Sequence, residues 1–412
     1  MKIALVSPYD FPYPGGVTEH IVGLAKAVSK QGHEVHILAA CSGYQNVTVP
    51  NMQIVTRRVI SIPIGGAVAR VGWSPGSYRR IKQILQGEAF EVIHLHEPLT
   101  PGLTWLVLQQ TRTLPRTVTV GTFHAYHEQP NWFYTRGRPL FNKFFARLDA
   151  LIAVSGAARD FAYRMFPGDY QIIPNGVDLA RFAQKNGRAT PPQGITTRPE
   201  VTILFVGRLD KRKGFETLLK AFIKLKVDHP QLRLKVAGPF GAQEVARYRP
   251  LIPFHLATDI TFVGYVSPEG MSTLYHSADI FCAPSLGFES FGVVLLEAMA
   301  AGLPIIATDI AGYRSVLTAG QEGLLVPPDR PDLLAEALVS LIDQPCLRQA
   351  MGERGRQKAG QYSWDHIGDK ILKLYQATIE IKLGVDTKVV PPPVQSRFQL
   401  QPRQANPEGK SC

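Results

Sequence analysis

Short apolar runs alternate along this chain with longer segments in which apolar residues recur at helical spacing. Residues 2–7 form an apolar run that predicts a strand, and residues 17–31 follow with the spacing of an amphipathic helix. The same order returns later, with an apolar strand over 201–206 and a helix over 215–225. Strands and helices in alternation build parallel, doubly wound sheets, so the pattern predicts an α/β protein with two Rossmann-like domains.

A polar stretch separates the two alternating regions. Residues 185–200 are rich in Pro, Gly and Thr and show no periodicity, which is typical of a linker. We therefore expect an N-terminal domain over 1–178 and a C-terminal domain over 179–362, followed by an amphipathic helix over about 363–383. The last residues, 384–412, are rich in Pro, Gln and Arg and are predicted to be disordered.

Composition narrows the class of protein. The 412 residues carry a formal net charge of +12, which favours an anionic partner such as a phosphorylated substrate or an acidic membrane. No module combines basic and aromatic residues as nucleic-acid binders do, so we expect no nucleic-acid partner. The four cysteines form no Cys-x-x-Cys pair, which argues against a zinc site and favours a cytoplasmic protein. No apolar run is long enough to span a bilayer, so any membrane association is expected to be peripheral.

The most informative stretch is 285–312, SLGFESFGVVLLEAMAAGLPIIATDIAG. It predicts a helix over 293–301 between two apolar strands, with Glu289 just before the helix and Glu297 inside it. Gly292 lets a ligand approach the first turn, whose free N–H groups and dipole attract phosphate. A carboxylate beside a phosphate needs a neutral partner, and sugar hydroxyls fit. The stretch predicts a site for a phosphate-linked sugar; the alternative is an ordinary strand–helix–strand unit with surface glutamates.

A basic loop is the second candidate. Residues 207–214, GRLDKRKG, follow the first strand of the second domain and bring Arg208 and Lys213 to the ligand end of the sheet. Arginine offers a bidentate contact to phosphate and lysine a point charge, so the loop predicts an anion clamp. The alternative is a basic surface loop. Gly16, in a Gly–Gly turn at the start of the first helix, could add a backbone contact to phosphate, although such turns also occur without a ligand.

Histidines gather at the ends of two predicted strands. One strand leads into His94, His96 and Glu97, a spacing that suggests a metal. His94 and His96 point to the same face of the strand, but no third ligand is evident, so we favour buried or substrate-facing roles. His124 follows the next strand at its carboxyl end, where ligands of open α/β sheets bind.

Residues 77–86, SYRRIKQILQ, predict an amphipathic helix with Ile81, Ile84 and Leu85 on one side. One interpretation is a helix at a membrane interface, held by apolar burial and by roughly 1 kcal/mol for each basic residue. The other interpretation is a solvated helix face. The basic residues are Arg79, Arg80 and Lys82.

Several of these motifs occur together in one family. The segments PYDFPYPGGVTEH, TFHAYHE, GRLDKRKGFETLLKAF and CAPSLGFESFGVVLLEAMAAGLPIIATD resemble the retaining glycosyltransferases of family 4, and among them the bacterial phosphatidylinositol mannosyltransferases. The resemblance implies a GT-B fold, in which two Rossmann-like domains face a central cleft and the last helix crosses back to the first domain. It also implies transfer of a hexose, with GDP-mannose as the expected donor, to a lipid such as phosphatidylinositol at the inner face of the cell membrane.

By position, the resemblance implies a role for each matching residue of the donor site. Arg208 and Lys213 would neutralise the leaving diphosphate, Glu289 would hold hydroxyls of the transferred sugar, and His124 would line the reaction centre. Glu297 would meet the nucleotide ribose and Gly16 the diphosphate. The remaining donor contacts would be Val266, Ser290, Phe291, Gly292 and Val293.

The acceptor site is assigned in the same way. Arg70 would meet the phosphate of the lipid, Tyr9 would lie near its inositol ring, and His124 would border both substrates. The cations on the helix over 77–86 match the membrane-binding helix of the family. These are again Arg79, Arg80 and Lys82.

The chain contains no Asp-x-Asp motif, so we expect transfer that needs no metal and no other cofactor. Arg208, Lys213 and the helix start at Gly292 would neutralise the negative charge of the leaving phosphate. The chain departs from the family at 62–66, after His124 and after Val266, where only Glu269 could serve a guanine base. Two alternatives therefore stay open: a UDP-sugar donor with another glycolipid or polysaccharide precursor as acceptor, and a non-catalytic protein that binds anions or lipids.

Overall fold

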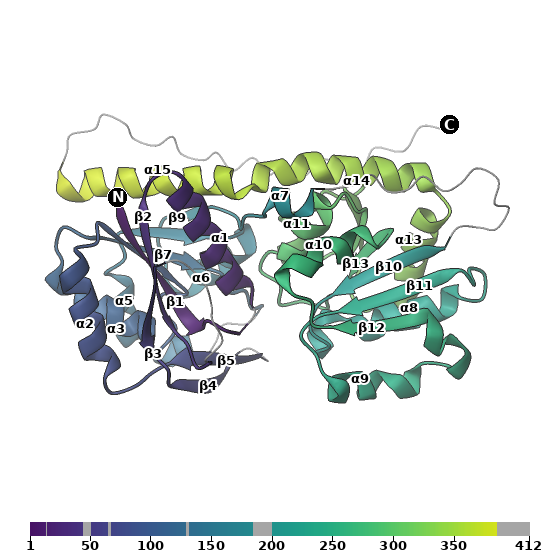
Figure 1. Ribbon diagram of the computed structural model, residues 1–412, viewed down its shortest axis with the longest axis horizontal. Coiled ribbons are helices and arrows are strands. Elements are labelled where there is room, and N and C mark those ends of the chain that lie inside the picture. Colours follow the sequence, from purple (N-terminus) through teal and green to yellow (C-terminus); the bar gives the residue numbers. More distant parts are fainter. Residues whose placement is uncertain (14, 44–50, 65–66, 129–131, 184–199, 385–412) are drawn as a thin grey trace.

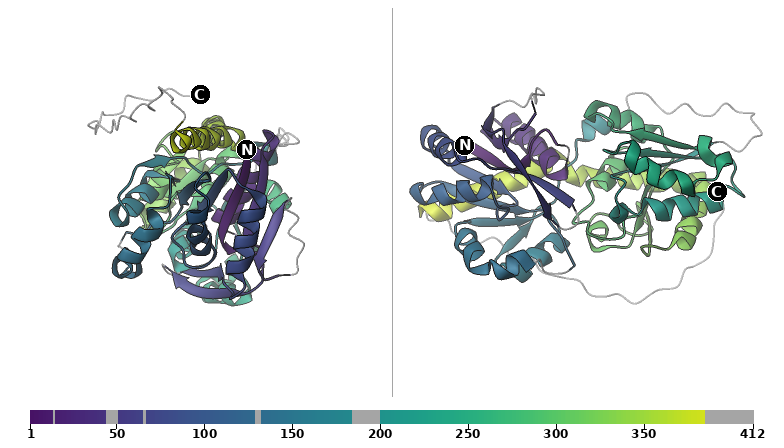
Figure 2. Two further views of the ribbon diagram at one scale, coloured as in Figure 1. Left: turned by 90° about the vertical axis from the view of Figure 1, so that its left-hand side faces the viewer. Right: turned by 90° about the horizontal axis from the view of Figure 1, so that it is seen from below.

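The computed structural model describes residues 1–13, 15–43, 51–64, 67–128, 132–183 and 200–384. It contains two α/β domains side by side, bridged along one side by the last helix (Figure 1). Figure 2 shows the same two lobes from one end and from below. Apart from Glu200 and Gly384, the predicted linker at 185–200 and the predicted disordered tail at 384–412 lie outside the described residues.

The first domain is built on a parallel sheet in the order β3-β2-β1-β6-β7-β8-β9. A hairpin of β4 and β5 adds to it, because β5 pairs antiparallel with the end of β1, where Tyr9 opposes Val71. The strands are β1 (Lys2–Asp10), β2 (Glu34–Ala40), β3 (Met52–Thr56), β4 (Val59–Ile64), β5 (Ala67–Gly72), β6 (Val92–His96), β7 (Val118–Phe123), β8 (Ala150–Ala153) and β9 (Tyr170–Ile172).

Helices cover both faces of this sheet, so the strands read as continuous apolar runs rather than as alternating ones. The first helix, α1, packs on one face together with the last helix of the chain, and α2 and α3 pack on the other (Figure 1). The helices are α1 (Gly16–Lys30), α2 (Ser77–Glu88), α3 (Leu103–Gln110), α4 (Trp132–Arg136), α5 (Arg138–Phe145), α6 (Gly156–Met165) and α7 (Leu179–Phe182).

The second domain has a sheet of six parallel strands in the order β12-β11-β10-β13-β14-β15. Its first strand and helix have the bounds that the sequence predicts, 201–206 and 215–225. The strands are β10 (Val201–Val206), β11 (Leu232–Ala237), β12 (Ile260–Gly264), β13 (Ile280–Ala283), β14 (Ile305–Thr308) and β15 (Gly323–Val326). The helices are α8 (Phe215–Leu225), α9 (Ala242–Tyr248), α10 (Pro268–His276), α11 (Val293–Ala300), α12 (Ala311–Arg314), α13 (Pro331–Ile342) and α14 (Pro345–Ala359).

The last helix, α15 (Trp364–Leu383), leaves the second domain and lies against the first, as predicted (Figure 1). Its first residue, Trp364, lies against two glycines of the first domain: a Cβ added to Gly23 or Gly176 would come within 2.1 or 2.5 Å of the indole ring. Further along, the Tyr375 hydroxyl is 2.6 Å from Nδ1 of His94. The two domains are therefore joined through well-packed contacts as well as through the chain.

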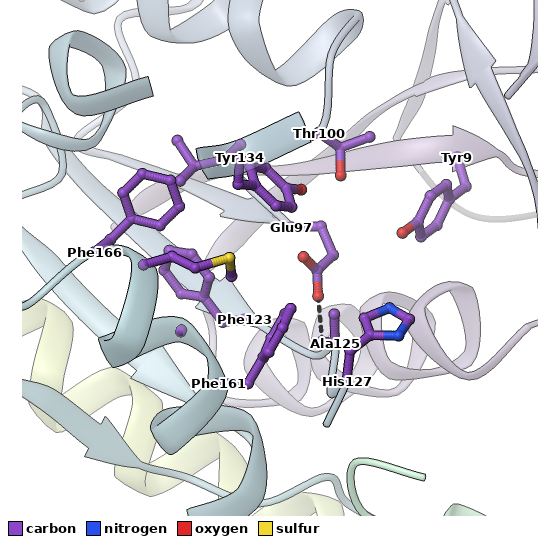
Figure 3. Close-up of a pocket in the computed structure, with 12 residues that line it drawn as sticks. Tyr9, Glu97, Thr100, Phe123, Ala125, His127, Tyr134, Phe161 and Phe166 are labelled. Carbon is purple, nitrogen blue, oxygen red and sulfur yellow. Dashed lines mark hydrogen bonds between the residues drawn. The ribbon is translucent and has the colours of Figure 1, made fainter. Parts of the chain in front are cut away.

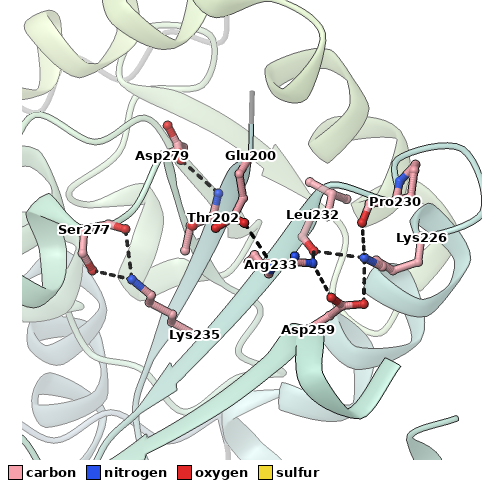
Figure 4. A network of polar contacts seen from close by, with 10 residues as sticks. All are labelled: Glu200, Thr202, Lys226, Pro230, Leu232, Arg233, Lys235, Asp259, Ser277 and Asp279. Carbon is pink, nitrogen blue, oxygen red and sulfur yellow. Dashed lines mark hydrogen bonds and ion pairs between the residues drawn. The ribbon is translucent and has the colours of Figure 1, made fainter. Parts of the chain in front are cut away.

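A polar network ties the amino ends of the second sheet together (Figure 4). Asp259, just before β12, pairs with Arg233 of β11 and lies 2.8 Å from the Lys226 ammonium that follows α8. Asp279, just before β13, accepts a hydrogen bond of 2.9 Å from the backbone N–H of Thr202 in β10. These contacts lie at the end of the sheet opposite to the ligand end, so they hold strands together and leave the other end free for chemistry.

Candidate active site

Each sheet has one point where the strand order reverses, and the candidate residues gather there. In the first sheet this point lies between β1 and β6, so Tyr9 and Glu97 come from neighbouring strand ends. In the second it lies between β10 and β13, which are followed by the loops of Lys213 and Glu289. Ligands of doubly wound sheets bind in the crevice at such points. The structure thus brings the two predicted loops of the second domain into one place.

An ion pair forms the centre of the donor side. Nζ of Lys213 lies 2.6 Å from Oε1 of Glu289, and the two side chains are 18% and 15% exposed. Asp210 fixes the backbone of the lysine. Its carboxylate caps the short 3₁₀ turn Lys211–Lys213 and accepts a hydrogen bond from the Lys213 backbone N–H at 3.3 Å. The loop of Lys213 also bonds to the loop of Glu289, since the Leu286 N–H donates to the Arg212 carbonyl at 2.7 Å.

Arg208 lies beside this pair and is more open. Its side chain is 46% exposed, and its Nε is 3.4 Å from Asp210, which also lies 3.2 Å from Arg212. The Asp210 carboxylate therefore faces two cations of the loop, Arg208 and Arg212, while the Lys213 ammonium pairs with Glu289. The loop keeps an excess of positive charge, as an anion clamp requires.

The start of α11 depends on a glycine. Gly292 has a φ of 98°, which side chains disfavour, and a Cβ there would lie 2.7 Å from the Tyr313 ring. The sequence predicts that Gly292 lets a ligand approach the backbone. The structure adds a second reason for the glycine, which is the conformation of the residue before α11. The backbone of Glu289 packs as closely, because a Cβ on Gly312 would meet the Glu289 carbonyl at 2.0 Å.

The other predicted donor residues differ in how far they are buried. Glu297, in α11, is partly buried, receives a hydrogen bond of 2.7 Å from the Tyr275 hydroxyl, and has a raised pKa because of burial. Phe291 is 2% exposed and belongs to the hydrophobic core, so only its backbone is left to contact a ligand. Three others are half-buried: Val266, Ser290 and Val293.

The two domains meet at the candidate site. The Ser155 hydroxyl, at the start of α6, donates to the Ser290 carbonyl at 2.5 Å, and the rings of His127 and Phe288 have centroids 5.9 Å apart. Glu19, in the first turn of α1, is close enough to Glu297 to raise its pKa. The exposed Gly16, which opens α1, therefore lies on the side of the first domain that faces α11.

His124 is buried in a cluster of histidines. Its Nε2 is 3.1 Å from Nδ1 of His96, and its ring packs against that of His20 with centroids 4.9 Å apart. Burial lowers the pKa of His124 and His96 well below the ordinary value and that of His20 to about 4, so all three are neutral at pH 7. The sequence shows no third ligand beside His94 and His96; in the structure His96 gathers instead with His124 and with His20 from α1.

Glu97 is a site residue that the prediction did not include. It is 7% exposed, has a φ of 48°, and accepts from the backbone N–H groups of His124 and Ala125 at 2.5 and 2.6 Å. Burial, partly offset by these two hydrogen bonds, raises its pKa to about 7. Its position at a strand exit was the available signal, but from the sequence Glu97 was considered only together with His94 and His96 and received no role of its own.

Glu97 lies in the middle of a small cavity of about 50 Å³ (Figure 3). Tyr9 and Thr100 lie on one side of the carboxylate and the rings of Phe123, Phe161 and Phe166 on the other, so the cavity has a polar and an apolar wall. Tyr9 therefore lines this cavity, and its contact with an acceptor stays a prediction. Arg70 is engaged elsewhere, since its Nε is 3.1 Å from the fully buried carboxylate of Asp10.

The predicted membrane helix needs a correction. Ile81, Ile84 and Leu85 of α2 are 0%, 5% and 1% exposed and pack in the core of the first domain. Assigning this apolar face to lipid was wrong, because a repeating apolar stripe looks the same whether it packs on a sheet or on a membrane. The cations lie on the opposite, exposed face of the helix; they are Arg79, Arg80 and Lys82. Among the described helices, none is long and apolar enough to cross a bilayer.

Comparisons with known proteins identify the family. Residues 14–181 match the model of Glycosyltransferase Family 4, and residues 192–358 match that of Glycosyl transferases group 1. The chain belongs to this family of GT-B glycosyltransferases and is a hexosyltransferase. It is 35% identical to the phosphatidyl-myo-inositol mannosyltransferase of Mycolicibacterium smegmatis, over 91% of this chain and 94% of that protein. It is 34% identical to the protein of the same name from Propionibacterium freudenreichii, again over 91% and 94%.

Solved structures confirm the fold. Sucrose-phosphate synthase from Thermosynechococcus elongatus superposes with a TM-score of 0.72 at 24% identity, covering 92% of this chain and 99% of that one. HepE of Anabaena, in complex with UDP and glucose, superposes with a TM-score of 0.70 at 18% identity, covering 92% and 100%. The predicted pair of Rossmann-like domains in a GT-B arrangement is thereby confirmed.

Proposed function

We propose that this chain transfers a hexose from a nucleotide sugar, with GDP-mannose as donor, to a membrane lipid such as phosphatidylinositol. Transfer proceeds with retention at the anomeric carbon and without a metal ion. The observation that carries the proposal is the contact of 2.6 Å between Lys213 and Glu289 beside the exposed Arg208, at the reversal point of the second sheet.

This arrangement suits a sugar diphosphate. Lys213 neutralises Glu289, so a carboxylate can remain beside a diphosphate and still accept hydrogen bonds from sugar hydroxyls. Arg208 and the free N–H groups at the start of α11 supply further positive potential where the leaving phosphate gains charge. These groups can do the work that other glycosyltransferases give to a metal ion.

The state of the same carboxylate bears on the route by which a retaining transfer would proceed. A double displacement needs a free carboxylate as nucleophile, whereas Glu289 is bound by an ammonium group. We therefore favour departure of the diphosphate and attack of the acceptor from the same face, through a transition state that resembles an oxocarbenium ion. His124, which follows β7 and lies beside Glu97, would border the sugar on the other side.

The acceptor assignment draws on the cavity and on the relatives. The polar wall formed by Tyr9, Glu97 and Thr100 offers hydroxyl and carboxylate groups to a polyol headgroup. The relatives from Mycolicibacterium and Propionibacterium are both named for transfer to phosphatidyl-myo-inositol. The exposed cations of α2 lie on this domain and would hold it at an anionic surface, peripheral to the inner face of the cell membrane.

The test is a transfer assay with purified protein and vesicles that contain phosphatidylinositol. GDP-mannose and UDP-glucose are offered separately, each with and without EDTA, and lipid products are identified by mass spectrometry. We expect hexosyl-phosphatidylinositol from GDP-mannose, in equal yield with EDTA. A product from UDP-glucose alone would refute the donor, and a strict need for Mg²⁺ or Mn²⁺ would refute the metal-free mechanism. Vesicles of phosphatidylglycerol, equally anionic, control for surface charge.

A further inference from the structure

Three histidine rings meet inside the first domain, next to the cleft. His20 comes from the second turn of α1, His96 from the end of β6 and His124 from the residue after β7. They are 3%, 0% and 8% exposed. One ring nitrogen of each lies within 4.8 Å of those of the other two. Three separate elements thus bring imidazole groups to one point.

The tautomer of His20 is set by Asn175. Nδ1 of His20 lies 2.8 Å from the side-chain oxygen of Asn175, which is an acceptor, so Nδ1 carries the proton and Nε2 keeps its lone pair. That buried Nε2 has no hydrogen-bond partner among the described residues. Metal-bound histidines usually donate their second N–H to an oxygen in this way, which orients the ring and fixes the nitrogen that binds.

His96 and His124 share one proton between Nδ1 and Nε2, which are 3.1 Å apart. The other nitrogen of His96 is also buried and has no partner in the part of the chain that the structure describes. Its neighbour His94 differs, although the two rings stack with centroids 4.4 Å apart. Both nitrogens of His94 are used, at 2.6 Å each, by the hydroxyls of Tyr375 and Thr122. His94 therefore has no nitrogen left for a metal ion, whereas His20 offers its unpartnered Nε2 and His96 offers the Nδ1 that faces His124.

We propose that His20, His96 and His124 bind a divalent transition-metal ion of the zinc class, and that its binding inhibits the enzyme. Neutral imidazole is a preferred ligand of Zn²⁺, Co²⁺ and Ni²⁺. Zn–N bonds of about 2.0–2.1 Å in a tetrahedron separate the nitrogens by about 3.3 Å. Nδ1 of His96 and Nε2 of His124, which are 3.1 Å apart, are already near that separation. Because all three nitrogens lie within 4.8 Å of one another, His20 needs to approach by at most about 1.5 Å. Three protein ligands leave the fourth position to water.

We expect inhibition because His124 would be both a metal ligand and a residue that borders the transferred sugar. A metal ion there takes the nitrogen that His124 shares with His96 and holds the ring toward α1. The ring is then fixed away from the place where the sugar and acceptor meet. This half of the proposal rests on the proposed function, whereas metal binding does not.

The test uses the full-length protein, stripped of metal with a chelator, and Co²⁺ as the probe because tetrahedral Co²⁺ absorbs visible light. We expect one Co²⁺ per chain at this site, displaced by Zn²⁺. His20→Gln and His124→Gln should each weaken binding at least tenfold, with circular dichroism to check folding. If one variant does not fold, the other decides the result. Absent visible absorption, or unchanged binding in a folded variant, would overturn the proposal and leave a neutral cluster bridged by water.

Two control variants separate this cluster from other histidines. His36→Gln breaks the exposed group of Glu34, His36 and Glu88, the other candidate for a metal ion among the described residues. His255→Gln removes an exposed histidine outside either group. Both should keep the Co²⁺ spectrum.

The inhibitory half is tested with Zn²⁺ in the transfer assay. Transfer should fall with the midpoint of Zn²⁺ binding and return with EDTA. Unchanged transfer at full occupancy would overturn inhibition. If no transfer is found in any condition, the proposed function fails, but the Co²⁺ result still decides whether the site exists.

Discussion

Trp364 packs so closely on Gly23 of the first domain that one methyl group added there is expected to destabilise the protein. In Gly23→Ala, the new Cβ would lie 2.1 Å from Cε2 of the Trp364 ring. The ring cannot simply retreat, because a Cβ at Gly176 would also lie 2.5 Å from it, so backbone already packs on both sides. Overpacking of this kind costs about 1–3 kcal/mol.

An opposing effect must be subtracted. Gly23 lies inside α1, where alanine is favoured over glycine by up to about 1 kcal/mol. For so close an approach we take the upper part of the overpacking range, about 2–3 kcal/mol, and expect Gly23→Ala to lower the free energy of unfolding by about 1–2 kcal/mol. At about 2–4 °C for each kcal/mol, the melting temperature of the first domain should fall by roughly 2–8 °C.

Differential scanning calorimetry measures this change, and Gly87→Ala is the matched control. Gly87 also lies in a helix, α2, but a Cβ there meets nothing within 4 Å. The control should keep or raise the melting temperature. Trp364→Phe replaces the indole with a smaller ring. Combined with Gly23→Ala, it should recover part of the lost melting temperature. If Gly23→Ala is as stable as the wild type, the close packing of α15 on α1 is not as described.

Three further predictions concern function. Lys213→Ala and Glu289→Gln should each lower kcat by about 10²–10³-fold with unchanged circular dichroism, since each loses a charge that stabilises the transition state; near-normal rates would refute their roles. Arg79→Glu combined with Arg80→Glu should abolish sedimentation with anionic vesicles while calorimetry shows unchanged nucleotide binding, and binding equal to that of the wild type would make α2 an ordinary surface helix. Saturating nucleotide should reduce the radius of gyration in small-angle scattering if the domains close on the donor, whereas an identical curve would argue against closure.

Hydrophobic periodicity predicted the order of strands and helices well, because strands and helices alternate in both domains. The bounds of β10 and α8 agree with the sequence, since each apolar run is strong and ends at a Gly or a charged residue. The proximity of Lys213 and Glu289 was also predictable, because both follow strands whose carboxyl ends share one edge of the sheet.

Contacts between distant elements were not predictable in this way. His20 joins His96 and His124 only because α1 packs across the ends of β6 and β7, and no local pattern encodes that crossing. The apolar stripe of α2 was visible, but the sequence could not show whether sheet or lipid covers it. Side-chain periodicity reports that a face is buried, and only the tertiary structure reports what buries it.

The interdomain contacts are unequal in a way that bears on how the enzyme works. At the cleft, the domains touch through polar and ring contacts, such as Ser155 with Ser290 and His127 with Phe288, and through the packing of α6 on α12. Along α15 they are joined by an indole packed between two glycines and by a backbone bridge between Val177 and Ser363. The contacts of the indole with the two glycines leave no room for even one added methyl group. Opening of the cleft for substrate exchange should therefore pivot near Val177 and Trp364, with α15 kept on the first domain.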